Sequence, residues 1–134
     1  ELRIVTDATI EIVNLAVNSF VRNDLEMAMM VEPLEEVIDE LKIQMKDQHI
    51  KRLQAGACTI ELGFVLTDLM TNFERVSDHC SNIAVCQIET AHSSFDTHAY
   101  LNSVKTGDNS EFLQHYQEFR QKYRLPWHKA EISK

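Results

Sequence analysis

The chain has 134 residues and a net charge of −8 with neutral histidines, because 21 Asp and Glu outweigh 13 Lys and Arg. Its longest basic cluster is Lys51-Arg52, which is too small to neutralise a nucleic-acid backbone or to hold an anionic membrane surface. Hydrophobic residues make up 44% of the chain, enough for a buried core, whereas 3 Gly and 2 Pro leave few turns for an all-β fold. We therefore expect an all-α protein that binds no nucleic acid.

The start of the chain and its cysteines indicate its surroundings. The longest uncharged runs, such as residues 12–21, have ten residues, and an apolar membrane helix needs about 20, so we expect no direct membrane insertion. The sequence begins with Glu1 and has no cationic and apolar leader, so we expect it to belong to a longer chain. Cys58, Cys80 and Cys86 are odd in number and lack CxxC spacing, which favours reduced, buried thiols in the cytosol.

Apolar spacing predicts a first helix over residues 2–22 and a second helix after it. The first repeats apolar side chains at helical intervals, at Leu2, Val5, Ala8, Ile12, Leu15 and Ala16. Asn23-Asp24 is a polar break with cap-forming side chains, and the second helix starts near Leu25. Because Pro33 removes a backbone donor and clashes one turn back, we expect a kink there or a break near Glu32.

The second and third helices show the longest regular pattern. From Leu34 the second helix continues to Leu53, and residues 54–56 supply a stop. The third helix runs to about Thr90. Its predicted seam alternates spacings of 4 and 3 at Leu62, Leu66, Leu69, Phe73, Val76, Cys80 and Ile83. Residues 1–90 should therefore fold as an antiparallel three-helix bundle with a short turn between its second and third helices.

Residues 91–109 change character. They are rich in polar residues, and we expect an ordered linker whose three large apolar side chains dock on the bundle. These side chains are Phe95, Tyr100 and Leu101.

Residues 110–134 predict a C-terminal helix and a frayed tail. The helix starts at the N-cap Ser110 and is ended by Pro126. Its aromatic stripe comprises Phe112, Tyr116, Phe119 and Tyr123. Core packing is the simpler interpretation of this stripe, whereas an exposed stripe would indicate a dimer or a transporter contact.

Two acidic pairs carry the candidate chemistry. Glu35 and Asp39 on the second helix are four residues apart, as are Glu74 and Asp78 on the third, so each pair shares a helix face. Like charges at this spacing repel by a few tenths of a kcal/mol, so the pairs need solvent screening or a cation. Either pair alone is typical of a solvated helix face.

The hairpin places both pairs at one height. Their midpoints are residues 37 and 76, and both lie at nearly the same distance along the helices from a chain reversal near residue 55 or 56. The two heights differ by no more than about one helical turn. Antiparallel folding then brings four carboxylates level, a donor set suited to iron, manganese, magnesium or calcium. In the predicted seam Glu74 and Asp78 face outward, so the metal would be superficial and would keep water or phosphate ligands. An interior di-iron site is not expected, because it needs two Glu-x-x-His motifs and the chain has one, at 89–92.

Two segments resemble the PhoU family, HIKRLQAGAC at 49–58 and NFERVSDHCSNIA at 72–84. The second is specific, because the family motif is approximately Glu-Arg-Ile-x-Asp-His-x-x-Asn-Ile-Ala and here only the Ile is replaced, by Val76. The matching residues are Glu74, Arg75, Asp78, His79, Asn82, Ile83 and Ala84. The resemblance covers residues 1–90.

The resemblance implies a regulator of phosphate uptake that holds metal, iron being one candidate, on its bundle surface. Carried over residue by residue, the ligands would be Glu35, Asp39, Glu74 and Asp78. The Arg-Leu-x-x-Gly-x-Cys segment at 52–58 looks like the PhoU-type domain at the cytoplasmic C-terminus of bacterial sodium/phosphate cotransporters. It implies a place at the inner face of the cell membrane, with the membrane portion of the same parent chain as partner and phosphate as a candidate ligand.

Other expectations follow from the same comparison of motifs. Free-standing family members have two three-helix repeats and this chain has one, so we expect a homo-oligomer. The alternative function is a metal-free helical module for protein contacts or dimerisation. An enzyme is not expected, because the chain has no Gly-rich phosphate loop, GxSxG or HExxH motif.

Residues beside the acidic pairs have open roles. Arg75 would pair with a carboxylate one turn away or reach an anion, and His79 would be a ligand or a hydrogen-bonded polar residue. Asn82 would support a carboxylate or bond to the first helix. Glu32 and Glu36 would enlarge the cluster or remain solvated.

Overall fold

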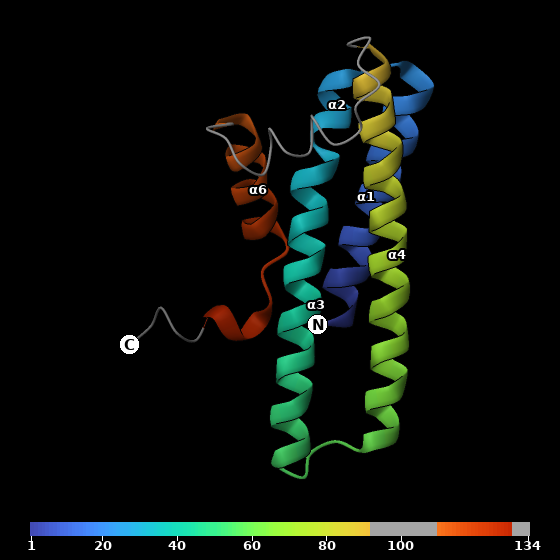
Figure 1. The fold of residues 1–134 in the computed structure, drawn as a ribbon. Helices are drawn as coiled ribbons and strands as arrows, with labels where there is room; N and C mark the ends of the chain where they lie inside the picture. Colours follow the sequence, from blue (N-terminus) through green and yellow to red (C-terminus); the bar gives the residue numbers. More distant parts are fainter. Residues whose placement is uncertain (92–109, 130–134) are drawn as a thin grey trace.

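The computed structural model describes residues 1–91 and 110–129 (Figure 1). Within these residues the chain is helical and has no strand, which confirms the all-α prediction. The elements in chain order are α1 (Leu2–Arg22), α2 (Leu25–Met29), α3 (Val31–Gln54), α4 (Ile60–Ala91), α6 (Ser110–Lys122) and a 3-10 turn (Pro126–Lys129).

Helix α1 has the predicted bounds, and its C-terminal end follows from two polar side chains. Asn23 adopts φ 52°, the left-handed conformation that ends many helices, and its N–H bonds to the Phe20 carbonyl. Asp24 then caps α2, because its carboxylate accepts a hydrogen bond of 3.0 Å from the Met27 N–H. The polar break predicted at these two residues is confirmed.

The chain breaks again at Met30, two residues before the predicted position at Glu32. Pro33 is the third residue of α3. In the first turn of a helix the backbone N–H groups have no helical acceptor, so a proline there sacrifices no hydrogen bond. The predicted second helix is therefore two helices, and the proline lies inside the start of the longer one.

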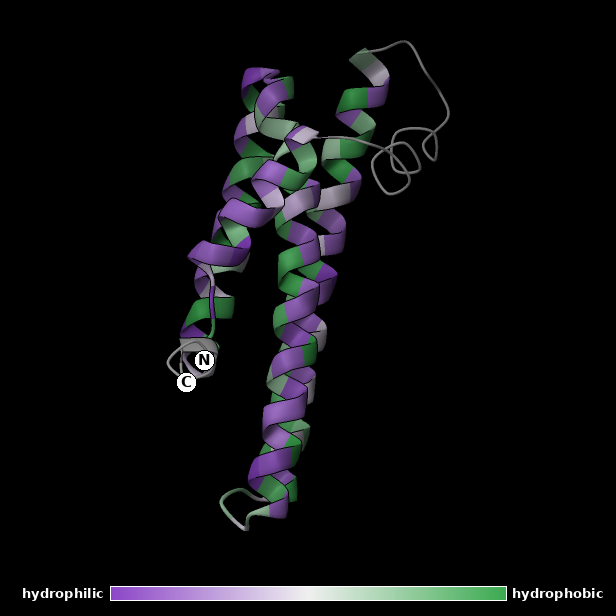
Figure 2. Cartoon of the chain, turned by 90° about the vertical axis from the view of Figure 1, so that its left-hand side faces the viewer, coloured by the Kyte–Doolittle hydropathy of each residue, from purple (hydrophilic) through white to green (hydrophobic). Residues whose placement is uncertain are grey.

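Helices α1, α3 and α4 form the antiparallel bundle (Figure 1). The hairpin of α3 and α4 is longer than α1 and continues well past its N-terminal end (Figure 2). We call residues 46–69 the outer hairpin. Its one buried residue is His49, whereas Met45 and Met70, just inside it, belong to the bundle core.

Part of the predicted seam of α4 is wrong. Of its seven positions Cys80 is buried and Leu66 and Phe73 are half-buried, but the other four are exposed: Leu62, Leu69, Val76 and Ile83. Helix α4 instead buries Met70, Ser77, Cys80, Ser81, Ala84, Val85, Ile88 and Glu89. Small side chains dominate the middle of this face, where α4 packs against both α1 and α3. Small residues allow close approach between helices, so the buried face of α4 is turned away from its line of large aliphatic residues.

One described helix, α1, is long and apolar enough to cross a membrane by length and composition. It reaches that composition because apolar residues lie on two faces. Val5, Ala8 and Ile12 are buried in the bundle, whereas Val17 and Phe20 are exposed. A core helix of a soluble protein passes the same test, so the expectation that the segment does not insert stays a prediction.

Helix α6 lies along α3 (Figure 1). Its aromatic stripe packs inward, with Phe119 and Tyr123 buried and Phe112 and Tyr116 half-buried, as core packing predicts. The helix starts at Ser110 and ends at Lys122, four residues before Pro126. The predicted linker contacts of Phe95, Tyr100 and Leu101, and most of the predicted tail, lie outside the described residues.

Candidate functional site

Two contacts between α3 and α4 fix the height of the acidic pairs. The Ser81 hydroxyl donates a hydrogen bond to the Glu32 carboxylate, and further along the hairpin, towards its turn, Lys42 forms an ion pair with Glu74. Residues 35–39 of α3 therefore lie opposite residues 74–78 of α4. The structure brings the two sequence motifs to one level, as the hairpin geometry predicts.

Asp39 shows how closely the charges of the two helices are gathered. Burial raises the pKa of its carboxyl above the usual value, and the carboxylates of Glu74, Asp78 and Glu36 raise the pKa further. The Lys42 ammonium acts in the opposite direction and lowers it. In addition, Oδ1 of Asp39 is buried and has no hydrogen-bond partner within the described residues. Among residues 1–91 and 110–129 this oxygen is therefore an acceptor without a donor, close to other carboxylates.

Glu35, the remaining predicted ligand, lies with two other glutamates of α3. Carboxylate oxygens of Glu32, Glu35 and Glu36 all lie within 4.8 Å of one another. Glu36 thus lies close to Glu35, and it is also near enough to Asp39 to raise the pKa of that carboxyl. We define the acidic cluster as six carboxylates that α3 and α4 contribute at this level of the hairpin: Glu32, Glu35, Glu36, Asp39, Glu74 and Asp78.

The cluster runs from the protein interior to solvent. Glu32 is 4% exposed and hydrogen-bonded to Ser81, whereas Glu35, Glu36, Asp39 and Glu74 are half-buried and Asp78 is exposed. A cation bound here would therefore meet protein oxygens on one side and water on the other, an arrangement that hard divalent cations accept.

Lys42 is a member of the site that the sequence analysis did not include. It lies one turn after Asp39 on the same helix, and its ammonium pairs with Glu74 across the hairpin. The sequence held a signal for this, because Lys42 is three residues after Asp39 and residues three apart share a helix face. The protein thus supplies one positive charge of its own to the acidic cluster.

His79 and Asn82 line another feature of α4. Together with Phe20, Ile83 and Cys86 they line an open, mainly apolar groove of about 780 Å³ between the ends of α1 and α4. Arg75 is exposed, and no ion pair of its guanidinium is seen within the described residues. The roles considered for these three polar residues stay predictions.

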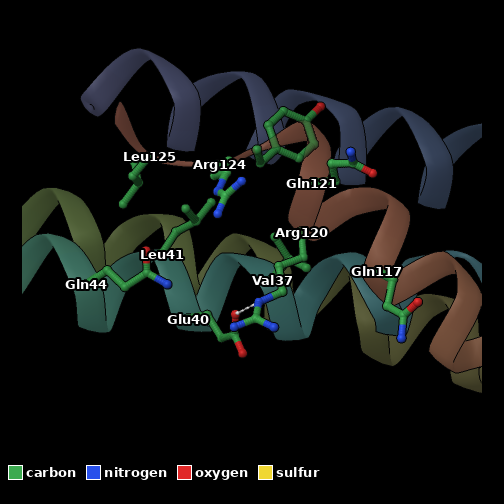
Figure 3. A pocket seen from close by; sticks show the side chains of 10 residues that line it. Val37, Glu40, Leu41, Gln44, Gln117, Arg120, Gln121, Arg124 and Leu125 are labelled. Atoms are coloured by element: carbon green, nitrogen blue, oxygen red, sulfur yellow. Dashed lines mark ion pairs between the residues drawn. The ribbon is translucent and has the colours of Figure 1, made fainter. Parts of the chain in front are cut away.

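A cavity of about 350 Å³ lies between α3 and α6 (Figure 3). Arg120 of α6 forms an ion pair with Glu40 of α3 in it, with Nε 3.2 Å from a carboxylate oxygen. The same carboxylate accepts a hydrogen bond from the Tyr116 hydroxyl. The sequence pattern did not predict this cavity, because its walls come from elements far apart in the chain. Its charged groups serve the docking of α6 on α3.

Comparisons with known proteins identify relatives of this chain. Residues 2–86 match the sequence profile of the PhoU domain. A curated relative is the phosphate-specific transport system accessory protein PhoU homolog 1 of Thermotoga maritima, which is 28% identical over 109 residues. The match covers 80% of this chain and 46% of the relative, so the chain spans about half the length of that protein. No solved structure matches the chain significantly.

Proposed function

Because the chain belongs to the PhoU family, we propose that it is a regulatory domain that modulates phosphate uptake and binds metal on its acidic cluster. The observation that carries the metal site is the position of Asp39. Its buried Oδ1 has no hydrogen-bond partner among the residues that the structure describes, and carboxylates of both hairpin helices lie near it. A bound cation would give this oxygen a partner and would add to the positive charge that Lys42 brings to the cluster.

The link to phosphate uptake rests on relatives. The name of the Thermotoga protein describes an accessory protein of a phosphate-specific transport system. The Arg-Leu-x-x-Gly-x-Cys segment at 52–58 supports a narrower assignment, the cytoplasmic domain of a sodium/phosphate cotransporter. On this proposal the partner is the membrane portion of the same parent chain, the domain lies at the inner face of the membrane, and its role is regulation without catalysis.

The ligands that we propose are Glu35, Asp39, Glu74 and Asp78, with Glu36, which lies near Glu35 and Asp39 on α3, as a fifth donor. Carboxylate oxygens suit iron, manganese, magnesium and calcium, and the family resemblance makes iron the first metal to test. When bound, such an ion would supply a positive centre with coordination positions open to water or phosphate. The chain's own residues would hold the ion and exclude water on the Glu32 side, where the carboxylate is buried.

Elemental analysis tests this proposal. The chain is purified without chelator, loaded anaerobically with iron or manganese, and compared with the double variant Glu74→Ala/Asp78→Ala. We expect metal in the wild type and its loss from the variant, with helicity retained because neither side chain belongs to the core. The matched control is Glu61→Ala/Asp68→Ala, which removes two exposed carboxylates from the same helix outside the cluster. Equal metal content in the wild type and the Glu74→Ala/Asp78→Ala variant would contradict the site.

A second candidate function is self-association, which the exposed apolar side chains between α1 and α4 favour. Phe20 is 68% exposed and Ile83 is 42% exposed, and both line the same groove. We propose a second copy as the occupant, because the chain spans only about half the length of the related protein. Burial of such side chains on both copies would favour association.

Sedimentation analysis tests the self-association. The wild type should form a dimer, and Ile83→Lys should shift it towards monomer. The control is Leu113→Lys, which places the same charge at an exposed apolar residue of α6. A wild type that stays monomeric at high concentration would contradict this second candidate and would leave the metal site unaffected.

A further inference from the structure

A cysteine and a histidine meet at the end of the outer hairpin. Cys58 lies in the turn between α3 and α4, and its Sγ is 3.5 Å from Nδ1 of His49, which is in the last turns of α3. His49 is 8% exposed, whereas Cys58 is half-buried. The thiol therefore reaches solvent while the imidazole beside it does not.

The other edge of the imidazole is enclosed by Gly63. A Cβ atom built at Gly63 would lie 2.5 Å from Nε2 of His49, so a side chain there would displace the ring. Nε2 is buried and has no hydrogen-bond partner in the described part of the chain. The polar contact of this ring within those residues is thus the one to the Cys58 sulfur. The position of the ring is set by packing on one edge and by the thiol on the other.

We propose that Cys58 is a site of reversible thiol–disulfide exchange, with His49 as its general base and a low-molecular-weight disulfide as the reagent. Nδ1 of His49 takes the thiol proton as Sγ attacks one sulfur of the disulfide. The Sγ–S bond forms, the S–S bond of the reagent breaks, and the departing thiolate takes up the proton. The products are a mixed disulfide on Cys58 and one free thiol, so atoms and electrons balance.

The surroundings of Cys58 leave room for this reaction. Gly56, Ala57 and Thr59 are small and exposed, so the turn does not cover the sulfur with bulky side chains. The turn also lies at the far end of the hairpin from α2 and the end of α4 (Figure 1). A small disulfide can therefore approach from solvent without any movement of the bundle.

The other two cysteines differ from Cys58 in ways that make them internal references. Cys80 is 6% exposed, and burial raises the pKa of its thiol, so it should react only when the bundle opens. Cys86 is more exposed than Cys58, yet no histidine contact of its thiol is seen within residues 1–91 and 110–129. If exposure alone set the rates, Cys86 would react first.

The test uses the whole chain and glutathione disulfide, with the rate at each cysteine followed by mass spectrometry. We expect Cys58 to react faster than Cys86. In His49→Gln we expect the Cys58 rate to fall at least about tenfold, because the general base is lost. The control His115→Gln alters a histidine of α6, outside the turn, and should leave the Cys58 rate unchanged.

Two further measurements separate chemistry from folding. Faster labelling of Cys80 in a variant would reveal that its bundle has loosened. Gly63→Ala keeps both reactive groups but displaces the imidazole, so it should also slow Cys58 while the Cys86 rate stays constant. The proposal is overturned if Cys58 in the wild type reacts no faster than Cys86, or if neither His49→Gln nor Gly63→Ala slows it.

Discussion

Lys42 of α3 forms an ion pair with Glu74 of α4 within the acidic cluster. Both side chains are about one-third exposed, at 31% and 30%, so the pair is neither a free surface contact nor fully buried. The same ammonium lowers the pKa of the Asp39 carboxyl, whereas the nearby carboxylates of Glu74 and Asp78 raise it. A lysine thus occupies part of the electrostatic position that a metal ion would take.

The first prediction concerns competition between this lysine and a metal ion. Lys42→Gln should raise the affinity of the cluster for a divalent cation such as Mn²⁺ by up to about fivefold, because a partly exposed ion pair is worth about 1 kcal/mol. Calorimetric titration measures the affinity. Lys46→Gln, one turn further along α3 and exposed, is the matched control and should leave it unchanged. An unaltered affinity in Lys42→Gln would show that the ammonium and the ion do not compete.

The second prediction follows from the raised pKa of Asp39, whose causes are burial and then the neighbouring carboxylates, opposed by Lys42. A carboxyl whose folded pKa is raised contributes most to stability below its unfolded pKa of about 3.9, and this contribution is lost as pH rises through the folded value. In chelator, Asp39→Asn should therefore stabilise the protein at neutral pH by roughly 0.2–0.5 kcal/mol for each like-charge contact removed. The gain should vanish as pH falls towards about 4.

Thermal unfolding at several pH values measures this effect. Asp47→Asn, an exposed position on the same helix, supplies the comparison for the loss of one negative charge. If the two variants show the same pH dependence, net charge rather than the cluster is responsible.

The third prediction concerns the docking of α6 by two carboxylates. Glu40 accepts a hydrogen bond from the Tyr116 hydroxyl and forms an ion pair with Arg120. Glu11 of α1 accepts a hydrogen bond from the Tyr123 hydroxyl and forms an ion pair with Lys122. Tyr116→Phe/Tyr123→Phe removes both hydroxyl donors and should cost about 1 kcal/mol for each hydrogen bond lost. The fluorescence of Trp127, the one tryptophan of the chain, reports the change, because this side chain packs on the core beside α6.

The same contacts predict an alkaline transition. Burial and the nearby Glu40 carboxylate raise the pKa of Tyr116 to about 12, and burial with Glu11 raises that of Tyr123 as well. The stabilising contribution of these hydroxyls is complete below the unfolded pKa of about 10 and is lost as pH rises through the folded values. Trp127 emission should shift to longer wavelength in that range. The double Phe variant should lack this step, and Tyr100→Phe, the control at the third tyrosine, should keep it.

Much of the fold was predictable because it depends on local spacing. The helical repeat of apolar residues over 2–22 and the polar pair Asn23-Asp24 specify α1 and its end without reference to the remainder of the chain. The level of the acidic motifs was also predictable, since a short turn and a constant rise per residue determine which parts of α3 and α4 face each other.

Features that depend on packing between distant elements were not predictable in the same way. Leu62 and Ser77 both lie at helical intervals from other candidate core positions, and only the approach of α1 and α3 decides that the serine is buried and the leucine exposed. Burial of the Glu32 carboxylate likewise requires the Ser81 hydroxyl from another helix. The ion pair of Lys42 requires the facing Glu74, so its role is visible only after the hairpin is assembled.

The length of the α3–α4 hairpin relative to α1 implies a gradient of local stability along it. His49 is the one buried side chain among residues 46–69, so opening this region exposes little apolar surface, whereas opening the part beside α1 disrupts the whole core. Amide protons of the outer hairpin should therefore exchange with solvent deuterium through small local fluctuations, and those near Met45 and Met70 only through global unfolding. A covalent change at the turn would accordingly alter the exchange of its own neighbourhood first and leave the core protected.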